Sequence, residues 1–328
     1  MSQKWFVGCD LGGTKVNAAI VDTDTGLTLG SVLEASLSRE GPDAIVAQVT
    51  RLVKAAILAS GIPPAQIRGM GVGVPAVLDP DKGAVEVIPN FAGAWIGYPL
   101  RDRLQSNSEL PVHLLNDARC MTYGEWKFGA GRGVENLACL TLGTGVGGGL
   151  VLDGRLHLGA GARAGELGHQ ILEPHGLPCG CGSRGCLETL ASGPAIAAMG
   201  MRAIRQGMAS RLGELVNQDL NRVTAEVIAR AAQEGDALAL GLFAQAGFYL
   251  GIAIANVAAS LAVSRVVVGG GVALAGEILF APMRATFRER ARTLPAEKIA
   301  IVPAGLGVMA GLIGAAGWAR EKTQEGKA

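Results

Sequence analysis

The sequence has little charge, no excess of charge of either sign and no unbroken hydrophobic run of membrane length. Only 17% of its 328 residues are charged, and 29 basic against 28 acidic side chains leave a formal net charge of +1. This balance gives no electrostatic reason to expect nucleic acid or a membrane surface as a partner. The apolar stretch at residues 248–263 is interrupted by Gly251 and Asn256, which is typical of a buried helix rather than a membrane span.

Further absences narrow the class of protein. The apolar run at residues 5–9 is too short for a secretory signal. The 49 glycines follow no collagen period, and a hydrophobic share of 49% excludes a disordered chain and predicts a large core. At this length we expect two domains of ordinary size. Three of the six cysteines stand alone in apolar contexts, which fits the reducing cytoplasm.

The remaining three cysteines form a compact motif. Cys179, Cys181 and Cys186 have the spacing C-x-C-x4-C, with glycines between them that let the backbone turn tightly. His169 lies ten residues before the first of them and can supply a fourth ligand. Three thiolates and one imidazole are the donors of a closed tetrahedral zinc site. We therefore predict a structural zinc ion in this loop.

Other interpretations of the loop remain open. The cysteines could be three small buried side chains, and His175 is an alternative fourth ligand. A zinc-ribbon module for nucleic acid would need two C-x2-C knuckles and basic flanks, which the loop lacks. Glu166 and Glu188 bracket the cysteines, and we expect these carboxylates to accept hydrogen bonds from a polyhydroxylated ligand.

A strand-turn-strand pattern occurs twice along the chain. Apolar residues 4–10 lead into Gly12-Gly13-Thr14 and a second strand, and apolar residues 136–142 lead into Gly143-Thr144-Gly145 and a second strand. Leu11 of the first copy corresponds to Leu142 of the second, 131 positions later. A repeat of domain length predicts a duplication into two α/β halves.

Strands and helices are expected to alternate through the rest of the chain. We expect strands at residues 27–35, 67–74, 112–115, 265–268 and 299–302. We expect helices from Pro42, from 116–117 to about 128, at 194–206, 224–232 and 237–260, after 271, and at 306–320. Residues 75–98 are expected to form a loop, and the charged tail beyond Glu321 is expected to fray.

Both glycine turns are candidate phosphate sites. Asp10 ends the first strand and can hold a water of Mg²⁺, while Gly12 and Gly13 let a phosphate approach the backbone amides. The second turn begins a G-x-G-x-x-G pattern, but a dinucleotide motif requires a helix directly afterwards. The stretch at residues 147–153 is too short and too rich in glycine for one. A Walker A loop is also excluded, because Lys15 has no matching upstream glycine.

Five motifs together resemble the ROK family of sugar kinases and repressors. They are D-L-G-G-T-K at 10–15, Asn116-Asp117, L-G-T-G-V-G-G-G at 142–149, G-E-L-G-H at 165–169 and C-G-C-G-S-R-G-C-L-E at 179–188. The resemblance covers essentially the whole chain. It implies an α/β fold of the actin-like, hexokinase-like (ribonuclease H-like) class, with a cleft between duplicated domains. We expect these domains at 1–117, completed by helix 306–320, and at 118–305, with the zinc loop at 165–188.

The resemblance also implies roles for individual residues. Asp117 resembles the general base that takes the proton from the sugar hydroxyl as it attacks the γ-phosphoryl group of ATP. Without the resemblance, Asn116 or Asp117 is equally a candidate helix N-cap. The sugar-binding positions would be Asn90, Asn116, Asp117, Glu166, His169 and Glu188. The nucleotide-binding positions would be Asp10, Gly12, Gly13, Thr14, Lys15, Gly143, Thr144, Gly145, Gly270 and Gly271. The zinc ligands would be His169, Cys179, Cys181 and Cys186.

The implied activity is ATP-dependent phosphorylation of the 6-hydroxyl of glucose, with Mg²⁺ and a structural Zn²⁺, by a cytoplasmic homodimer. The alternatives are a kinase of N-acetylglucosamine, N-acetylmannosamine or fructose, or a sugar-responsive transcriptional regulator. Such regulators carry an N-terminal helix-turn-helix, for which we expect no room before the first strand at Trp5. Val308-Met309 departs from the polar or acidic pair that the family commonly has there, and the loop at 90–99 is one residue longer than expected.

Overall fold

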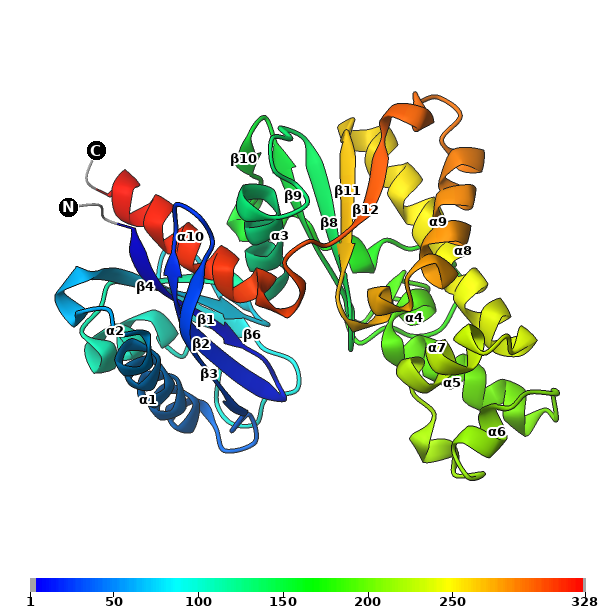
Figure 1. Cartoon of the computed structure of the whole chain (residues 1–328), viewed down its shortest axis with the longest axis horizontal. Coiled ribbons are helices and arrows are strands. Elements are labelled where there is room, and N and C mark those ends of the chain that lie inside the picture. The colour runs from blue at the N-terminus through cyan, green and yellow to red at the C-terminus, as the bar shows by residue number, and fades with distance from the viewer. Residues whose placement is uncertain (1–3, 327–328) are drawn as a thin grey trace. The chain divides into compact units, whose positions relative to one another are not determined.

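The computed structural model describes residues 4–326 and divides them into two compact units, which are coloured along the chain in Figure 1. Unit 1 contains the described residues up to Glu135, Gly154–Gly165 and those from Gly305 onward, and unit 2 contains Asn136–Asp153 and Glu166–Ala304. The units divide after residue 135 rather than after residue 117. Helix α3 (Asp117–Phe128) packs along the C-terminal helix α10 (Ala310–Glu325) and therefore belongs to unit 1.

The sheet of unit 1 has the strand order β3-β2-β1-β4-β7. Its strands are β1 (Trp5–Leu11), β2 (Lys15–Asp22), β3 (Thr28–Ala35), β4 (Ile67–Val74) and β7 (Val112–Asn116). The first three are antiparallel neighbours, and β4 and β7 run parallel to β1. The carboxyl ends of β1, β4 and β7 therefore lie at one edge of the sheet, with Asp10 opposite Gly73. The predicted strands of this half are confirmed.

Helices cover both faces of this sheet. Helices α1 (Pro42–Ser60) and α2 (Leu100–Ser108) lie on one face, and α3 and α10 lie on the other (Figure 1). As predicted, Pro42 occupies the first turn of α1, where its missing N–H costs no helical hydrogen bond. Ile45, Val49, Leu52 and Ala56, which lie on one face of α1 at helical spacing, are all fully buried. Unit 1 also contains β10 (Arg155–Leu156) and the 3-10 turns Pro64–Gln66, Ala160–Ala162 and Gly307–Met309.

Two expectations for unit 1 were wrong. The region at residues 75–98 is not only a loop, because β5 (Val77–Asp79) and β6 (Ala84–Val87) pair there as a short antiparallel hairpin. The C-terminal helix does not fray beyond Glu321 but continues to Glu325. Glu321 accepts a hydrogen bond of 2.8 Å from the hydroxyl of Tyr123, and Thr323 donates one of 2.7 Å to the carbonyl of Ala319.

The strands of unit 2 lie in the order β9-β8-β11-β12. They are β8 (Leu137–Leu142), β9 (Val146–Leu152), β11 (Arg265–Gly269) and β12 (Ala300–Pro303). The helices are α4 (Glu188–Ala191), α5 (Gly193–Arg205), α6 (Leu212–Leu215), α7 (Ala225–Gln233), α8 (Ala237–Leu261) and α9 (Glu277–Arg290). The 3-10 turns are Leu167–His169, Leu220–Arg222, Gly271–Ala275 and Ala296–Lys298. The second predicted hairpin, the last two predicted strands and the predicted longer helices are confirmed.

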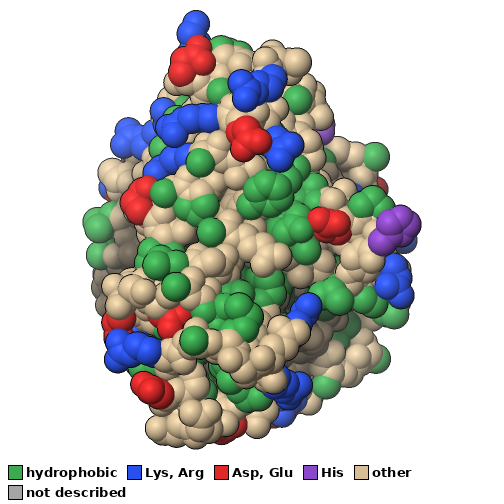
Figure 2. Space-filling model, turned by 90° about the vertical axis from the view of Figure 1, so that its right-hand side faces the viewer, with side chains coloured by type: hydrophobic (Ala, Val, Ile, Leu, Met, Phe, Trp, Pro, Cys, Tyr) green, Lys and Arg blue, Asp and Glu red, His purple; other side chains and the backbone are tan. Residues whose placement is uncertain are grey.

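Helix α8 is the most apolar of the longer helices among the described residues. It contains no acidic or basic side chain, and by length and composition alone it could cross a membrane. Phe243, Leu250 and Ile254 are buried in the core of unit 2, and the helix packs along α9, so a core helix explains its composition. Leu240 and Phe248 are exposed on it. On the face seen in Figure 2, hydrophobic side chains gather toward the middle while charged side chains lie mostly toward the margins.

Candidate functional site

The first glycine turn joins β1 to β2 and leaves backbone amides accessible. The amide of Gly12 donates to the carbonyl of Lys15 at 2.9 Å, and a Cβ on Gly12 would lie 2.9 Å from that same oxygen. The hydroxyl of Ser38 donates to the carbonyl of Gly13 at 2.7 Å and holds the turn from outside. Gly13 and Thr14 are exposed. A turn of this shape can receive an anionic oxygen on its amides.

Asp10 and Asp117 lie at the same edge of the unit 1 sheet. Asp10 is next to the last residue of β1, and Asp117 directly follows β7. Burial and, to a lesser extent, the negative charge of Asp117 together raise the pKa of the Asp10 carboxyl to about 6. Asp117 accepts a hydrogen bond of 2.8 Å from the amide of Ala118, which orients its carboxylate at the start of α3. Two carboxylates at the carboxyl ends of strands are a candidate site for a cation and a base.

Asn116 caps helix α3. Its side-chain oxygen accepts hydrogen bonds from the amides of Ala118 and Arg119 at 3.1 and 3.3 Å, and its side-chain nitrogen donates to the carbonyl of Ala76 at 3.4 Å. The capping interpretation from the sequence therefore applies to Asn116. A side chain fixed in this way also fixes the position of the adjacent Asp117, because both belong to the same helix start.

Asn90 lies in the loop that follows β6. It is exposed and has a φ of 65°, in the left-handed region that asparagine tolerates better than most residues. The loop is held by Trp95, whose indole N–H donates to the carbonyl of Ala92 at 2.9 Å and whose ring meets Phe91 edge-to-face at 5.6 Å. Phe91 is also 3.7 Å from the position of a Cβ on Gly13. The loop with Asn90 is thus packed against the first glycine turn.

The predicted zinc ligands come together in unit 2. One donor atom from each of His169, Cys179, Cys181 and Cys186 lies within 4.8 Å of all the others. The sulfurs of Cys181 and Cys186 are 3.7 Å apart, and the sulfur of Cys179 is 3.7 Å from Nδ1 of His169. Donors on a tetrahedral zinc with bonds of about 2.3 Å lie roughly 3.8 Å apart. The separations therefore fit a tetrahedral ion, whereas His175, the alternative ligand, is exposed.

The electrostatics of the cluster also favour a cation. Burial raises the pKa of the Cys179 thiol to about 12 and raises that of Cys186, while the backbone N–H of Ser183 lowers the pKa of Cys181. Crowded thiols resist ionising together, because each thiolate repels the next. A divalent ion removes this penalty by neutralising the thiolates.

Two carboxylates flank the cluster, as the sequence suggests, but they have different environments. Nε2 of His169 is 4.0 Å from the exposed carboxylate of Glu166. Glu188 is half-buried and accepts a hydrogen bond of 3.0 Å from the amide of Val146, while its other oxygen is 3.7 Å from the sulfur of Cys179. Glu188 therefore connects the cysteine loop to the second glycine turn, a contact that the sequence spacing did not reveal.

The second glycine turn, Gly143-Thr144-Gly145, follows β8, and a third, Gly269-Gly270-Gly271, follows β11. The two turns meet at the carboxyl ends of these strands. Gly143 donates to the carbonyl of Gly145 at 2.9 Å and accepts from the amide of Gly193 at 2.9 Å. Gly270 has a φ of 88°, and a Cβ on it would lie 2.4 Å from the carbonyl oxygen of Leu142. Only glycine fits there, so the turn before Gly271 packs directly on the end of β8. Gly193 is a further residue of this region that the sequence analysis missed.

The expected site residues thus form two groups. Unit 1 contains Asp10, Gly12, Gly13, Thr14, Lys15, Asn90, Asn116 and Asp117. Unit 2 contains Gly143, Thr144, Gly145, Glu166, His169, the three cysteines, Glu188, Gly270 and Gly271. Within each unit, residues far apart in the sequence are brought together.

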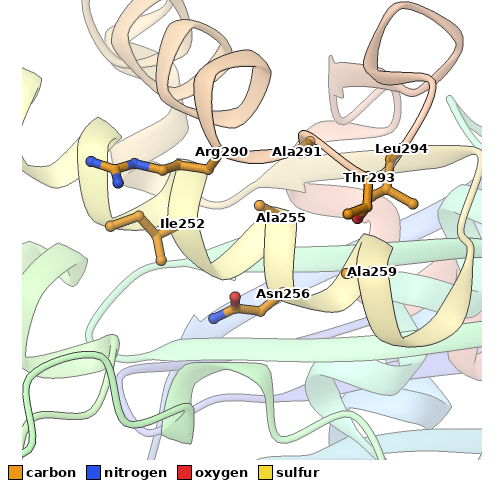
Figure 3. A pocket seen from close by; sticks show the side chains of 8 residues that line it. All are labelled: Ile252, Ala255, Asn256, Ala259, Arg290, Ala291, Thr293 and Leu294. Atoms are coloured by element: carbon orange, nitrogen blue, oxygen red, sulfur yellow. The ribbon is translucent and has the colours of Figure 1, made fainter.

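A pocket of about 290 Å³ lies away from these groups, between α8 and the end of α9 (Figure 3). Ile252 and Asn256 of α8 and Arg290 at the end of α9 line it. The Gly269–Gly271 turn precedes the start of α9, and the helix of 14 residues separates the pocket from that turn by about 20 Å. The guanidinium of Arg290 is 5.8 Å from the ring of Phe248. The pocket is therefore separate from the glycine turns.

Comparison with known proteins gives matches over the whole chain. The ROK family model matches residues 6–322. The chain is 35% identical over 324 residues to a glucokinase of Halalkalibacterium halodurans, which covers 97% of this chain and 95% of that protein. It is 31% identical over 312 residues to an N-acetylmannosamine kinase of Yersinia pseudotuberculosis, covering 95% of this chain and 97% of that protein.

A solved structure extends the comparison to three dimensions. The chain is similar to a ROK family glucokinase from Streptomyces griseus in complex with glucose and AMPPNP, with a TM-score of 0.83 and 33% identity. The match covers 97% of this chain and 99% of that one. The predicted actin-like, hexokinase-like α/β fold is thereby confirmed.

Proposed function

Because the chain belongs to the ROK family, we propose that it is an ATP-dependent glucokinase, which transfers the γ-phosphoryl group of ATP to the 6-hydroxyl of glucose. The products are glucose 6-phosphate and ADP. The observation that carries the proposal is the pair Asp10 and Asp117 at one sheet edge, beside an accessible glycine turn. The similarity to glucokinases at 35% and 33% identity supports glucose as the acceptor.

Asp117 is the proposed general base. It would accept the proton of the 6-hydroxyl as the sugar oxygen attacks the γ-phosphorus, with the bond to the β-γ bridging oxygen breaking on the opposite side. The hydrogen bond from the amide of Ala118 and the cap made by Asn116 hold the carboxylate at a rigid helix start. A base held in this way needs little reorganisation in the transition state.

The nucleotide would be bound mainly through backbone. We assign the phosphates to the turns Gly12-Gly13-Thr14-Lys15 and Gly143-Thr144-Gly145, and the adenosine side to Gly270 and Gly271. Asp10 would hold a water of Mg²⁺, which when bound neutralises charge on the phosphates. The donor set fits this ion, because carboxylate oxygen and water are the ligands that Mg²⁺ prefers.

The cysteine loop would shape the sugar site. We propose that His169, Cys179, Cys181 and Cys186 bind a structural Zn²⁺, which fixes the ring of His169. Glu166, His169 and Glu188 would bind sugar hydroxyls, and we propose the same role for Asn90 and Asn116. A metal that holds a hydrogen-bonding ring in one tautomer makes it a directional donor.

We further propose a cytoplasmic homodimer that binds neither nucleic acid nor membrane. The near-zero net charge and the free cysteines support the location, and the exposed, uncharged face of α8 supports self-association. Sedimentation at several concentrations tests the oligomeric state. A monomer at micromolar concentration would contradict it.

Measured phosphoryl transfer to a panel of hexoses, with ATP, ADP and polyphosphate as donors, tests the proposed activity. We expect glucose with ATP to give the highest kcat/KM. N-acetylmannosamine is the acceptor to compare, because a relative at 31% identity is a kinase of that sugar. A higher kcat/KM with an N-acetylated sugar than with glucose would show that the N-acetylated sugar is the preferred substrate. Absence of transfer to any hexose would refute the kinase assignment.

A further inference from the structure

The chain passes between the two units at four places. Side chains of helix α3 make hydrogen bonds beside several of these connections. The connections follow Glu135, Asp153, Gly165 and Ala304. Three buried polar side chains of α3, those of Arg119, Glu125 and Trp126, hydrogen-bond to backbone just outside three of these connections.

Arg119 and Trp126 make one such bond each. Nε of Arg119 donates to the carbonyl of Ala164 at 2.9 Å, two residues before the connection that leads to Glu166. The indole N–H of Trp126 donates to the carbonyl of Val134 at 2.9 Å, two residues before Asn136, the first residue after another connection. The carbonyl of Glu135 in turn accepts from the amide of Gly154 at 3.0 Å, so the fourth connection is joined to this one.

Glu125 makes the most extensive set. Its carboxylate accepts hydrogen bonds from the amides of Ala130 at 2.8 Å, Gly305 at 2.9 Å and Leu306 at 2.8 Å. Gly305 and Leu306 are the first residues after the chain returns from unit 2. A Cβ on Gly129 would lie 2.2 Å from the carboxylate, so glycine is required for the backbone to approach it.

Two of these side chains, the charged Arg119 and Glu125, are costly to bury for stability alone. The exposed fractions are 3% for Arg119, 0% for Glu125 and 9% for Trp126. Burying a charge costs several kcal/mol, and a hydrophobic side chain of similar volume often gives equal or higher stability. Four of the five bonds described above lie beside the chain connections, and the fifth, from the amide of Ala130, lies just beyond the end of α3. This distribution indicates that the bonds hold the chain connections in place, in addition to any contribution to stability.

We infer that Arg119, Glu125 and Trp126 are positioning residues that fasten the connections between the units to the helix that begins with Asp117. This inference rests on the proposed kinase function. Movement of unit 2 upon ligand binding must bend the chain at these connections. Because three of these connections are held to one rigid helix, bending of the chain is kept on the far side of these hydrogen bonds, and the base at the start of that helix keeps its catalytic position.

Glu125→Gln is the principal test, since the amide keeps the size of the side chain but replaces one acceptor oxygen with a donor. We expect kcat to fall between roughly tenfold and a hundredfold, the KM for ATP to change less than about threefold, and the share of ATP hydrolysed without sugar phosphorylation to rise. Trp126→Phe removes only one hydrogen-bond donor and should give a smaller change of the same kind. It keeps the inference testable if Glu125→Gln does not fold.

Thr122→Val is the matched control. Thr122 is also fully buried on α3, but its hydroxyl donates within the helix to the carbonyl of Ala118 at 2.8 Å. We expect kcat and the hydrolysis ratio to stay within about twofold of wild type, whatever the change in melting temperature. If Glu125→Gln and Trp126→Phe change kinetics no more than this control, the inference is wrong.

Hydrogen exchange provides a readout independent of turnover. In Glu125→Gln, the amides of Gly305 and Leu306 should exchange at least tenfold faster than in wild type, while the core amides of β1 stay unchanged. Unchanged exchange at both amides overturns the inference even if the enzyme is active. A wild-type protein that phosphorylates no hexose refutes the proposed function instead, and the exchange comparison still decides whether Glu125 holds the connection.

Discussion

The two glycine hairpins have the same topology but differ in length and in the side chains around them. Four residues separate Leu11 from its partner Val16 in unit 1, and three separate Leu142 from Val146 in unit 2. Asp10 stands next to the end of β1, whereas the corresponding residue of β8 is Thr141. Unit 1 thus has acidic side chains beside its turn. In unit 2 the turn offers mainly backbone groups, and the one carboxylate that binds it, Glu188, is 42 positions away in the sequence.

This difference indicates that the two duplicated units have different chemical roles. The carboxylates of unit 1 can take a proton and hold a cation, while unit 2 offers amides and a cross-linked loop that shape a binding surface. The following substitutions test this division. They are ordered by the size of the expected effect.

Asp117→Asn should have the largest effect. Removal of a positioned base typically lowers the rate about 10²- to 10⁴-fold, and the amide of asparagine cannot take the proton. Glucose binding, measured by calorimetry, should change little because the size of the side chain is kept. Near-normal kcat would remove Asp117 from the mechanism and with it the chemical role of unit 1.

Cys181→Ser should act on unit 2 and leave the chemistry of unit 1 in place. Loss of one zinc ligand should remove the bound zinc, lower the melting temperature and weaken glucose binding by roughly tenfold or more. The affinity for ATP should change less. Cys139→Ala, a change at a buried cysteine of β8 outside the cluster, is the control and should retain zinc. Active wild-type protein without zinc by elemental analysis would contradict the prediction.

Asp10→Asn should inactivate the enzyme and yet stabilise the fold at neutral pH. Burial and the charge of Asp117 raise the pKa of the Asp10 carboxyl in the folded protein from its ordinary value of 3.8 to about 6. The native state therefore holds a proton that the unfolded state releases, and its stability falls as the pH rises between about 4 and 6. The asparagine variant does not lose stability in this way and should be more stable than wild type at pH 7 by on the order of 3 kcal/mol.

Denaturant unfolding in EDTA at pH 4 and pH 7 checks this. The two proteins should differ at pH 7 and converge near pH 4, because Asp10 is then protonated in the native state. Equal stability at pH 7 would show that the Asp10 carboxylate is not destabilised by burial and by Asp117.

The sequence predicted much of this architecture because its patterns are local. The hairpins have clear glycine turns, α1 starts at Pro42, and the cysteine spacing fits one ion. Helix α2 was missed because only Leu100 and Leu104 of its residues are buried, too few for a periodic signal. The persistence of α10 depends on tertiary bonds such as that between Tyr123 and Glu321, 198 residues apart.

The candidate site was predictable to a similar extent. Asp10 was assigned from its place before a glycine turn and Asp117 from the resemblance to the family, and the structure shows that both lie at carboxyl ends of strands in one sheet. The contact of Glu188 with Val146 could not, because it joins residues 42 positions apart through a loop whose path depends on the cysteine cluster. Nor could the side chains of Arg119 and Glu125 be assigned, since their partners are backbone groups far along the chain.

Glu188→Gln should have the smallest effect and tests whether the second turn depends on the cysteine loop. A neutral amide oxygen can still accept the N–H of Val146, but without the charge the bond weakens by about 1 kcal/mol, or roughly fivefold in affinity. We expect the KM values for ATP and glucose to rise together, because Glu188 lies between the turn and the cluster. Glu166→Gln, at an exposed carboxylate beside His169, should raise only the KM for glucose. If both variants affect glucose alone, Glu188 does not support the turn, and the two hairpins bind phosphate without side-chain control.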